Sequence, residues 1–402
     1  MAMIDPRTPI GRRALLARSL QFGGGAVLLG SASALLAACG SDDDSSDATS
    51  APTTAAPTAD TTAGTTAGTT AGTTADTTAA TTGDTAAAGA DLGEMALRLS
   101  WIKNSEFAGS YIADNKGYYL QQGFSSANLI AGGPSAQPAE VDVSSGAALV
   151  GISAPDLVSA AIGAGSDLVI IGAQYQKNPF AVMSLASNPV KTPEEMYGKS
   201  FGLQSANQVV WDAFVASSGI DDSKIEKFPA QFDPTPLVNG ECDTWFSFVT
   251  NEPNLLKVQG VETVSFLLAD FGYPLISEVY VVKRESLTEK RAQLKAFLMA
   301  EILGWRDLYA TPELGAKLTV EDYGKDLGLD EAEQLLEVNS ELSLIFTDDT
   351  KKNGVFTVTD ELVKENIDTL AKAGITITAE QLFDFSILEE IYSEHPELMT
   401  VA

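Results

Sequence analysis

"AALVGISAPDLVSAAIGAGSDLVIIGAQY", residues 147–175, contains two apolar runs separated by a helix-like segment. The first run ends at "ISAP", and a Gly-Ser pair precedes the second run, which ends at "GAQY". Short apolar runs bounded by turn residues are typical of buried strands. We therefore predict that this stretch folds as strand, helix, strand.

The same alternation continues on both sides. Strand-like segments are followed by helix-like or turn residues at five further places, 95–101, 125–133, 178–187, 198–220 and 243–260. Residues 262–285 add more strand, and the chain from Leu287 onward is mostly helical in pattern. Such alternation indicates an α/β fold with largely parallel sheets, and residues 91–402 are long enough for two domains. Ligands of such sheets bind at the carboxyl ends of the strands.

The first 38 residues resemble an export signal. Arg12 and Arg13 precede a Gly-rich apolar stretch that ends in "LLAAC" at Cys39. The adjacent arginines resemble a twin-arginine signal, although Leu15 replaces its usual Phe, and "LLAAC" resembles a lipobox. A membrane-spanning helix over 20–38 is the alternative, but four glycines, two serines and the Cys that follows disfavour it. We expect Cys39 to carry lipid that anchors the chain to a membrane.

Residues 39–93 are predicted to form a disordered tether. Residues 41–90 contain no Leu, Ile, Val or aromatic residue, so they cannot bury enough apolar surface to fold. A flexible coil of this length spans roughly 40 Å. Threonines in it are candidates for glycosylation.

The net charge of −29 excludes some partners. The first 38 residues carry four Arg and one Asp, and seven Asp lie in 39–90, which leaves −25 for the folded part. This charge repels nucleic acid and anionic lipid. The chain has one His, His395, and two Cys, so no His-based triad or His/Cys metal site can form. We expect no enzyme activity, no cofactor and no metal. We expect the many carboxylates to be exposed to solvent. Cys242 is predicted to be a small core residue rather than a reactive thiol.

A family resemblance rests on three stretches. These are "W..N..FAG.YIA..KGYY...GF" at 101–124 with the following GGP loop, "NPFAVMSLASNPVKTPEEMYGKSFGLQ" at 178–204, and "FDFSILEEIYSE" at 383–394. They resemble ABC-transporter solute-binding proteins of the thiamine-pyrimidine/alkanesulfonate type. The resemblance implies a type 2 periplasmic-binding-protein fold, with two α/β lobes, a two-stranded hinge and a ligand cleft between the lobes. Lobe 1 would be 94–183 plus 275–402 and lobe 2 would be 184–274, with crossings near Leu185 and Tyr273. The implied partners are a small-molecule ligand and the permease and ATPase subunits of an importer, and we expect a monomer.

The ligand-binding candidates are aromatic and amide residues near predicted strand ends. Aromatic faces stack on flat rings, while amides fix their orientation. In the first lobe these candidates are Trp101, Asn104, Phe107, Tyr111, Ser153, Ala154, Gln174 and Tyr175. In the second lobe and at the return crossing they are Gln204, Asn207, Trp211, Trp245, Phe246, Asn251 and Tyr273, with Ser205 and Glu252 beside them. Each also has an explanation as a cap or a core residue.

No Arg or Lys is among these candidates, and Lys103 is the nearest base. This composition favours a planar heteroaromatic ligand such as a thiamine-type pyrimidine or a flavin precursor. An alkanesulfonate, taurine-like or nitrate-like anion is the alternative, because backbone N–H groups alone can hold anions. A sensory lipoprotein that transports nothing is a further alternative, which the neighbouring genes would distinguish.

Overall fold

The structure is a computed structural model, and it describes residues 91–400. The predictions for the export signal, the acylated Cys39 and the 39–90 part of the tether lie outside the described residues. No helix within 91–400 is long and apolar enough to cross a membrane.

The first sheet has five strands in the order β2-β1-β3-β10-β4. Its strands are β1 (Glu94–Arg98), β2 (Ser126–Ile130), β3 (Val150–Ser153), β4 (Leu168–Tyr175) and β10 (Ser277–Lys283). β1 is parallel to β2 and β3, whereas β10 runs antiparallel to β3 and β4. The stretch quoted first, 147–175, thus forms β3, the helix α4 (Pro155–Gly163) and β4, as predicted.

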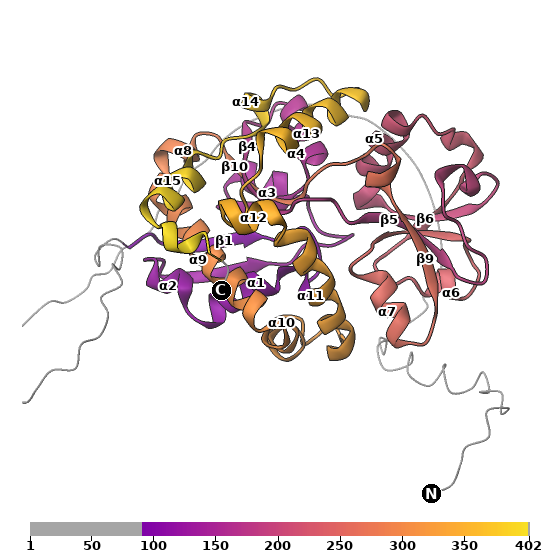
Figure 1. Ribbon diagram of the computed structural model, residues 1–402, viewed down its shortest axis with the longest axis horizontal. Helices are drawn as coiled ribbons and strands as arrows, with labels where there is room; N and C mark the ends of the chain where they lie inside the picture. Colours follow the sequence, from indigo (N-terminus) through magenta and orange to yellow (C-terminus); the bar gives the residue numbers. More distant parts are fainter. Residues whose placement is uncertain (1–90, 401–402) are drawn as a thin grey trace, which may run out of the picture. The chain divides into compact units, whose positions relative to one another are not determined.

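The second sheet repeats this arrangement in the order β7-β6-β8-β5-β9. Its strands are β5 (Phe180–Leu185), β6 (Ser200–Gln204), β7 (Glu226–Ala230), β8 (Thr244–Phe248) and β9 (Thr263–Leu267). β6 is parallel to β7 and β8, and β5 is antiparallel to β8 and β9. Figure 1 shows β5, β6 and β9 apart from β1, β4 and β10. The predicted α/β class is confirmed, but both sheets are mixed rather than largely parallel, because two of the four strand pairings in each are antiparallel.

The chain passes between the sheets twice, through residues 176–179 and 268–276. The expected boundary between 183 and 184, with a crossing near Leu185, falls at β5 and is corrected here. β5 pairs along its length with β8 and β9, so the chain has already entered the second sheet at Phe180. Sequence pattern alone does not show which sheet an apolar strand joins, because apolar runs look alike in either sheet.

Helices cover the sheets, and all the elements named after β10 are helices or turns. The helices within the two sheets' segments are α1 (Ala108–Asn115), α2 (Tyr118–Gln121), α3 (Ala139–Ser145), α5 (Gln208–Ser218), α6 (Thr235–Val238) and α7 (Glu252–Val258). The C-terminal helices are α8 (Ser286–Glu289), α9 (Arg291–Ala310), α10 (Pro312–Leu318), α11 (Glu331–Ile345), α12 (Asp348–Asn353), α13 (Asp360–Lys372), α14 (Ala379–Leu382) and α15 (Ser386–Glu394). Short 3₁₀ turns include η1 (Ser105–Phe107) and η3 (Ser205–Asn207), and a π turn spans Thr319–Tyr323.

Alternating side chains of the central strands enter different cores. In β10, Tyr280 packs into the core under α1 and α9, whereas Val281 packs into the core shared by α4, α5 and α13. In β8, Phe246 joins the latter core and Trp245 a smaller one with Cys242. This follows from the two-residue period of a strand. Burial raises the pKa of Cys242 to about 11, which agrees with its prediction as a core residue.

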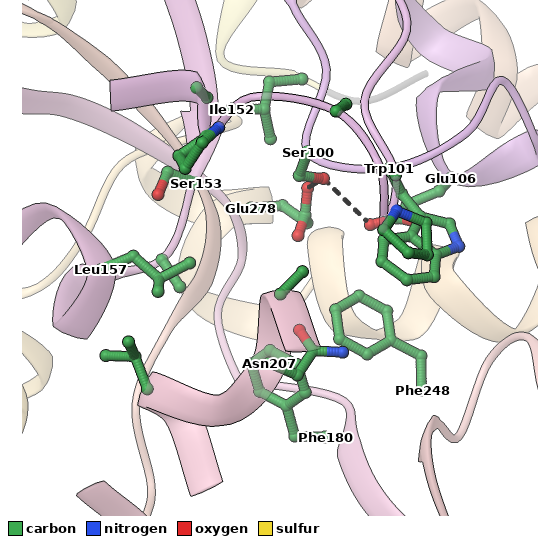
Figure 2. Close-up of a pocket in the computed structure, with 18 of the residues that line it drawn as sticks. Ser100, Trp101, Glu106, Ile152, Ser153, Leu157, Phe180, Asn207, Phe248 and Glu278 are labelled. Atoms are coloured by element: carbon green, nitrogen blue, oxygen red, sulfur yellow. Dashed lines mark hydrogen bonds between the residues drawn. The ribbon is translucent and has the colours of Figure 1, made fainter. Parts of the chain in front are cut away.

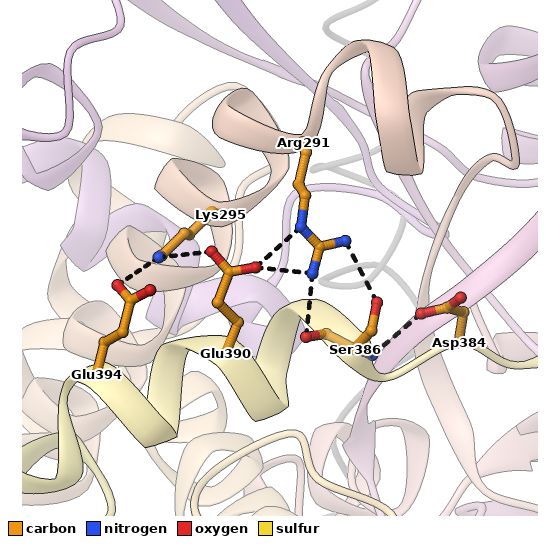
Figure 3. Close-up of polar contacts among 6 residues, drawn as sticks. All are labelled: Arg291, Lys295, Asp384, Ser386, Glu390 and Glu394. Atoms are coloured by element: carbon orange, nitrogen blue, oxygen red, sulfur yellow. Dashed lines mark hydrogen bonds and ion pairs between the residues drawn. The ribbon is translucent and has the colours of Figure 1, made fainter.

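A charged cluster fastens the last helix to α9 (Figure 3). Glu390 accepts hydrogen bonds from Arg291 Nε at 2.9 Å and Lys295 Nζ at 2.8 Å. Arg291 also donates to the Ser386 carbonyl at the start of α15 at 3.2 Å. Lys295 and Arg291 together hold the pKa of Glu390 below its usual value. The cluster therefore orients α15 against the first sheet's helices.

We predict that Glu390→Gln lowers the free energy of unfolding by about 1 kcal/mol near pH 7, because partly exposed ion pairs contribute about 0.2–1 kcal/mol each. A carboxylate with a lowered pKa stabilises the fold above its unfolded pKa of about 4.3, and this stabilisation is lost as pH falls through the lowered value. Urea unfolding at pH 7 and at pH 3 measures the effect, which should shrink at the lower pH. Glu389→Gln, at the exposed neighbouring position, is the control. Equal stability of both variants at pH 7 contradicts the prediction.

Candidate functional site

A cavity of about 410 Å³ lies between the two sheets. It is lined from the first sheet by residues that follow β1 and by the end of β3, and from the second by the turn after β6 and the end of β8. The parallel strands of both sheets therefore point their carboxyl ends at it, as expected for this class of fold. The antiparallel strands β5 and β10 reach the same edge with Phe180, the first residue of β5, and Glu278, the second residue of β10.

The first-sheet wall is shaped by a loop pressed against the end of β1. A Cβ on Gly132 would lie 2.4 Å from the Leu99 carbonyl oxygen, so only glycine allows this approach. Arg98 holds the other end of the loop, since it donates to the Gln137 carbonyl at 2.7 Å and pairs with Asp142 at 3.2 Å. These contacts place Gln137 and the start of α3 beside the cavity.

The second-sheet wall is aromatic. The Phe180 ring lies 5.2 Å from that of Phe246 and 4.7 Å from that of Phe248. Edge and tilted contacts of this kind fix ring orientation. Asn207 and Asn251 add amide groups at the turns that follow β6 and β8. Figure 2 shows Asn207, Phe180 and Phe248 across the cavity from Ser100 and Glu278.

Four carboxyl groups line the cavity, Glu106, Glu140, Glu252 and Glu278. Their residues are only 2%, 6%, 5% and 3% exposed. Ser100 Oγ lies 2.7 Å from Glu278 Oε2 and 3.5 Å from Glu106 Oε1, so one hydroxyl serves two carboxyls. Glu140 accepts a hydrogen bond from Ser153, and Glu252 Oε2 accepts one from the Phe248 N–H at 2.9 Å.

Burial raises the pKa of all three carboxyls for which a shift is resolved. For Glu106 the pKa lies well above its ordinary value, first because of desolvation and then because Glu278 is close. Desolvation also raises the pKa of Glu278 to about 7 and that of Glu252 to about 8. Charged carboxylates in a low-dielectric site without a cation are costly, so these groups hold protons near neutral pH.

Glu278 also has a strained backbone. Its φ of 48° lies in the left-handed region, although it is the second residue of a strand. Strain of this kind costs on the order of 1–3 kcal/mol and persists only where the surroundings enforce it. Here it turns the carboxyl toward Ser100 and the cavity (Figure 2).

Six of the residues predicted to bind ligand line the cavity. They are Trp101, Ser153, Ala154, Asn207, Phe246 and Asn251. Ser205 and Glu252, which the sequence also singled out, line it as well. Their role in binding stays a prediction, since lining a cavity shows position alone.

The structure places the other nine candidates outside the lining, and this corrects their predicted positions. They are Asn104, Phe107, Tyr111, Gln174, Tyr175, Gln204, Trp211, Trp245 and Tyr273, and all are buried.

The first-lobe residues among these nine pack inside their own half. Asn104 donates to Glu337 at 2.6 Å, and Tyr111 stacks on Tyr323 with ring centres 4.3 Å apart. Tyr175 donates to Glu341 at 2.7 Å. Phe107 is a core residue, and Gln174 is fully buried in β4.

The remaining four have internal partners too. Gln204 donates to the Phe246 carbonyl at 3.0 Å and Trp211 Nε1 to Asp222 at 2.7 Å. Trp245 packs on Gly202 in the smallest core. Tyr273 donates to Asp156 at 2.5 Å. Each of these side chains is thus used within the fold.

Sequence reasoning missed the carboxyl pair and most of the phenylalanine wall. Glu106 and Glu278 are 172 residues apart in sequence, so nothing in the pattern joins them, and the carboxylates were expected to be solvated. A signal existed at Glu278, because it precedes the apolar run "VYVV" that forms a buried strand. Phe180 and Phe248 are also aromatic residues at strand ends, so the criterion that selected Phe246 as a ligand-binding candidate applies to them too. Within the described residues, no group of three or more His, Cys, Asp or Glu is arranged to hold a metal ion.

Comparison with known proteins gives a family and a fold. Residues 104–314, more than half of the 402, match the family described as NMT1/THI5 like. The formylaminopyrimidine-binding protein of Halalkalibacterium halodurans is 23% identical over 267 residues, which cover 64% of this chain and 78% of that protein. The riboflavin-binding protein RibY of Chloroflexus aurantiacus is 24% identical over 240 residues, which cover 57% and 66%.

Solved structures show the same architecture. The periplasmic aliphatic sulphonate binding protein SsuA from Escherichia coli superposes with a TM-score of 0.52 at 15% identity. The superposition covers 73% of this chain and 92% of SsuA. At this identity the likeness shows the fold alone, and residues 91–400 have the predicted two-sheet fold of periplasmic binding proteins.

The raised pKa of Glu252 predicts a pH-dependent stability. A carboxyl whose folded pKa is raised favours the fold below its unfolded pKa of about 4.3, and that advantage is lost as pH rises through about 8. The free energy of unfolding should therefore decline less steeply with pH in Glu252→Gln than in the parent, by up to about 1.4 kcal/mol per pH unit. Urea unfolding at pH 5, 7 and 9 measures it. A variant whose stability falls with pH as steeply as the parent's contradicts the assignment.

Proposed function

Because the chain belongs to the NMT1/THI5-like family, we propose that it is the extracytoplasmic solute-binding receptor of an ABC importer. The ligand in this proposal is a small planar heteroaromatic molecule, either a thiamine-type pyrimidine or a flavin precursor. The observation that carries the proposal is a cavity between two sheets, with Trp101 on one wall and three phenylalanines on the other.

The size and lining of the cavity support a ring-shaped ligand. A volume of about 410 Å³ suits a small molecule, and ligand pockets usually combine apolar walls with a few polar groups. The indole of Trp101 and the rings of Phe246 and Phe248 offer flat apolar surface, while Asn207 and Asn251 offer hydrogen bonds. Two relatives named for a pyrimidine and a flavin bind flat heterocycles, which agrees with this choice.

We further propose that the two sheets belong to lobes that close around the ligand. Lobe 1 comprises 94–175 and 277–400, and lobe 2 comprises 180–267. Asn178 links the crossings, since its N–H donates to the Leu275 carbonyl and its side chain to the Tyr273 carbonyl, both at 2.8 Å. Two adjacent, hydrogen-bonded crossings suit a two-stranded hinge, with rotation spread over a few residues.

Export and anchoring complete the proposal. Arg12 and Arg13 direct the chain across the membrane, Cys39 receives lipid, and the segment up to residue 93 tethers the folded part near its permease. The chain acts as a monomer in this scheme, and catalysis has no part in it.

Trp101→Ala should weaken the binding of the recognised heterocycle at least about tenfold, because a stacked ring contributes both area and orientation. The full chain is first screened by thermal shift with hydroxymethylpyrimidine, formylaminopyrimidine and riboflavin, and titration calorimetry then gives the affinity of any binder. A bound ligand raises apparent stability by RT ln(1 + [L]/Kd).

Trp101→Phe is the matched control, since it keeps a flat ring and should retain most of the affinity. Unchanged affinity in Trp101→Ala removes Trp101 from the site. The absence of a shift with all three compounds contradicts the proposed ligand class.

Cys39→Ser should move the protein from the membrane fraction to the soluble fraction of the cells that express it. Acyl chains contribute about 0.8 kcal/mol per buried CH₂, so their loss removes the anchor. Fractionation with immunodetection measures the distribution, with Cys242→Ser as the control because that thiol is buried. Membrane retention of Cys39→Ser contradicts lipidation at this residue.

A further inference from the structure

The lining of the cavity contains four glutamates and no Lys, Arg or His. None of these glutamates forms an ion pair with any residue in the described range. The nearest buried cation, Arg98, is paired with Asp142. Buried carboxyls are normally protonated or paired with a cation. The described part of the chain supplies no cation to neutralise the four glutamates of this cavity.

The arrangement is most concentrated around Ser100. Glu106 and Glu278 share this hydroxyl, and the neighbouring Glu337 and Glu341 on α11 further raise the pKa of Glu106. Lys103 is half-buried. Burial lowers its pKa, and Asp114, rather than any of these glutamates, partly offsets that change. The Glu106–Glu278 pair thus has no cation of its own. Without a ligand, it is neutralised by binding protons.

Glu140 is a further carboxyl of the lining, and one of its oxygens accepts no hydrogen bond from the described residues. Glu140 accepts from Ser153 through Oε1, and Oε2 has no hydrogen-bond partner among the described residues although Glu140 is only 6% exposed. Glu140 lines the cavity, so this oxygen is open to a donor from a ligand. The neighbouring aromatic faces also attract cations.

We propose that the cavity takes a flat ring bearing a cationic nitrogen with N–H donors, such as an amidinium or a protonated amino heterocycle, and that Glu278 and Glu106 are its counter-charge. This inference rests on the proposed function and narrows its ligand class. The cation takes the place of a proton on the Glu106–Glu278 pair, and that proton is released to solvent. No covalent bond changes.

The same charges reject anions. A sulfonate placed among four glutamates meets either repulsion or groups that must all be protonated before it binds. A neutral ring fits the aromatic walls but leaves the pair's proton in place. Charge on the ligand, at constant ring size, should therefore decide the affinity.

Three benzene derivatives of similar size test this directly, namely benzamidinium, neutral benzamide and benzenesulfonate. We expect calorimetric titration of the full chain at pH 7 to show benzamidinium binding at least tenfold tighter than benzamide, and no binding of benzenesulfonate. Heats measured in two buffers with different ionisation enthalpies should show proton release with benzamidinium only. Glu278→Gln should reduce the preference for benzamidinium over benzamide to less than threefold.

Glu106→Gln is the second variant and should reduce the preference in the same direction, which keeps the test valid if Glu278→Gln does not fold. Glu313→Gln, at an exposed position, is the control and should keep the full preference. Equal affinity for benzamidinium and benzamide overturns this inference while leaving the aromatic-ring receptor intact. Tight binding of benzenesulfonate overturns this inference in favour of an anionic ligand. Failure of every flat ring, including riboflavin and hydroxymethylpyrimidine, overturns the proposed function itself.

Discussion

Asn178 holds together the two segments through which the chain passes between its sheets. Its backbone and side-chain N–H groups donate to the carbonyls of Leu275 and Tyr273, and its Oδ1 accepts from Phe180 N–H at 3.0 Å. One residue thus fixes the end of the outgoing crossing and the middle of the returning one. Because β5 and β10 start next to these crossings, their N-terminal ends reach the same edge as the carboxyl ends of the parallel strands, with Phe180 and Glu278 at the cavity. The cavity and its lining follow from this connection.

A layer of buried carboxyls extends from the cavity to the contact between α7 and α11. Glu252 at the start of α7 and Glu333, Glu337 and Glu341 on α11 are all at least 95% buried. Asn254 on α7 donates to Ser340 on α11 at 3.1 Å, so the two halves touch here. Desolvation raises the pKa of each of these four carboxyls. In the proposed closure of the lobes, bringing the halves together favours the protonated form of these acids.

The sequence was sufficient for the fold and for the edge of the sheets at which the site lies. Alternating strand and helix patterns located every described strand except β7, because each is a short run bounded by turns, whereas the division into two lobes came from the family resemblance. They did not assign side chains to walls. Trp245 and Phe246 are adjacent, yet only Phe246 lines the cavity, since a strand turns successive residues to opposite faces. Glu106 and Glu278 meet only through tertiary structure, and the left-handed φ of Glu278 has no local sequence signal.

Acidic first turns distinguish this cavity from an anion site. Helix N-termini bind anions through free N–H groups and the helix dipole. Here three helices that start beside the cavity carry their own acids, namely Glu140 in α3, Asp156 in α4 and Glu252 in α7, whereas the 3₁₀ turn η3 and α5 have none in their first turns. Leu157 N–H donates to Asp156 at 3.0 Å and Phe248 N–H to Glu252, so donors that an anion would need are already used. A fold shared with a sulfonate-binding protein therefore does not carry over its ligand, because the polarity of the site is set by these side chains.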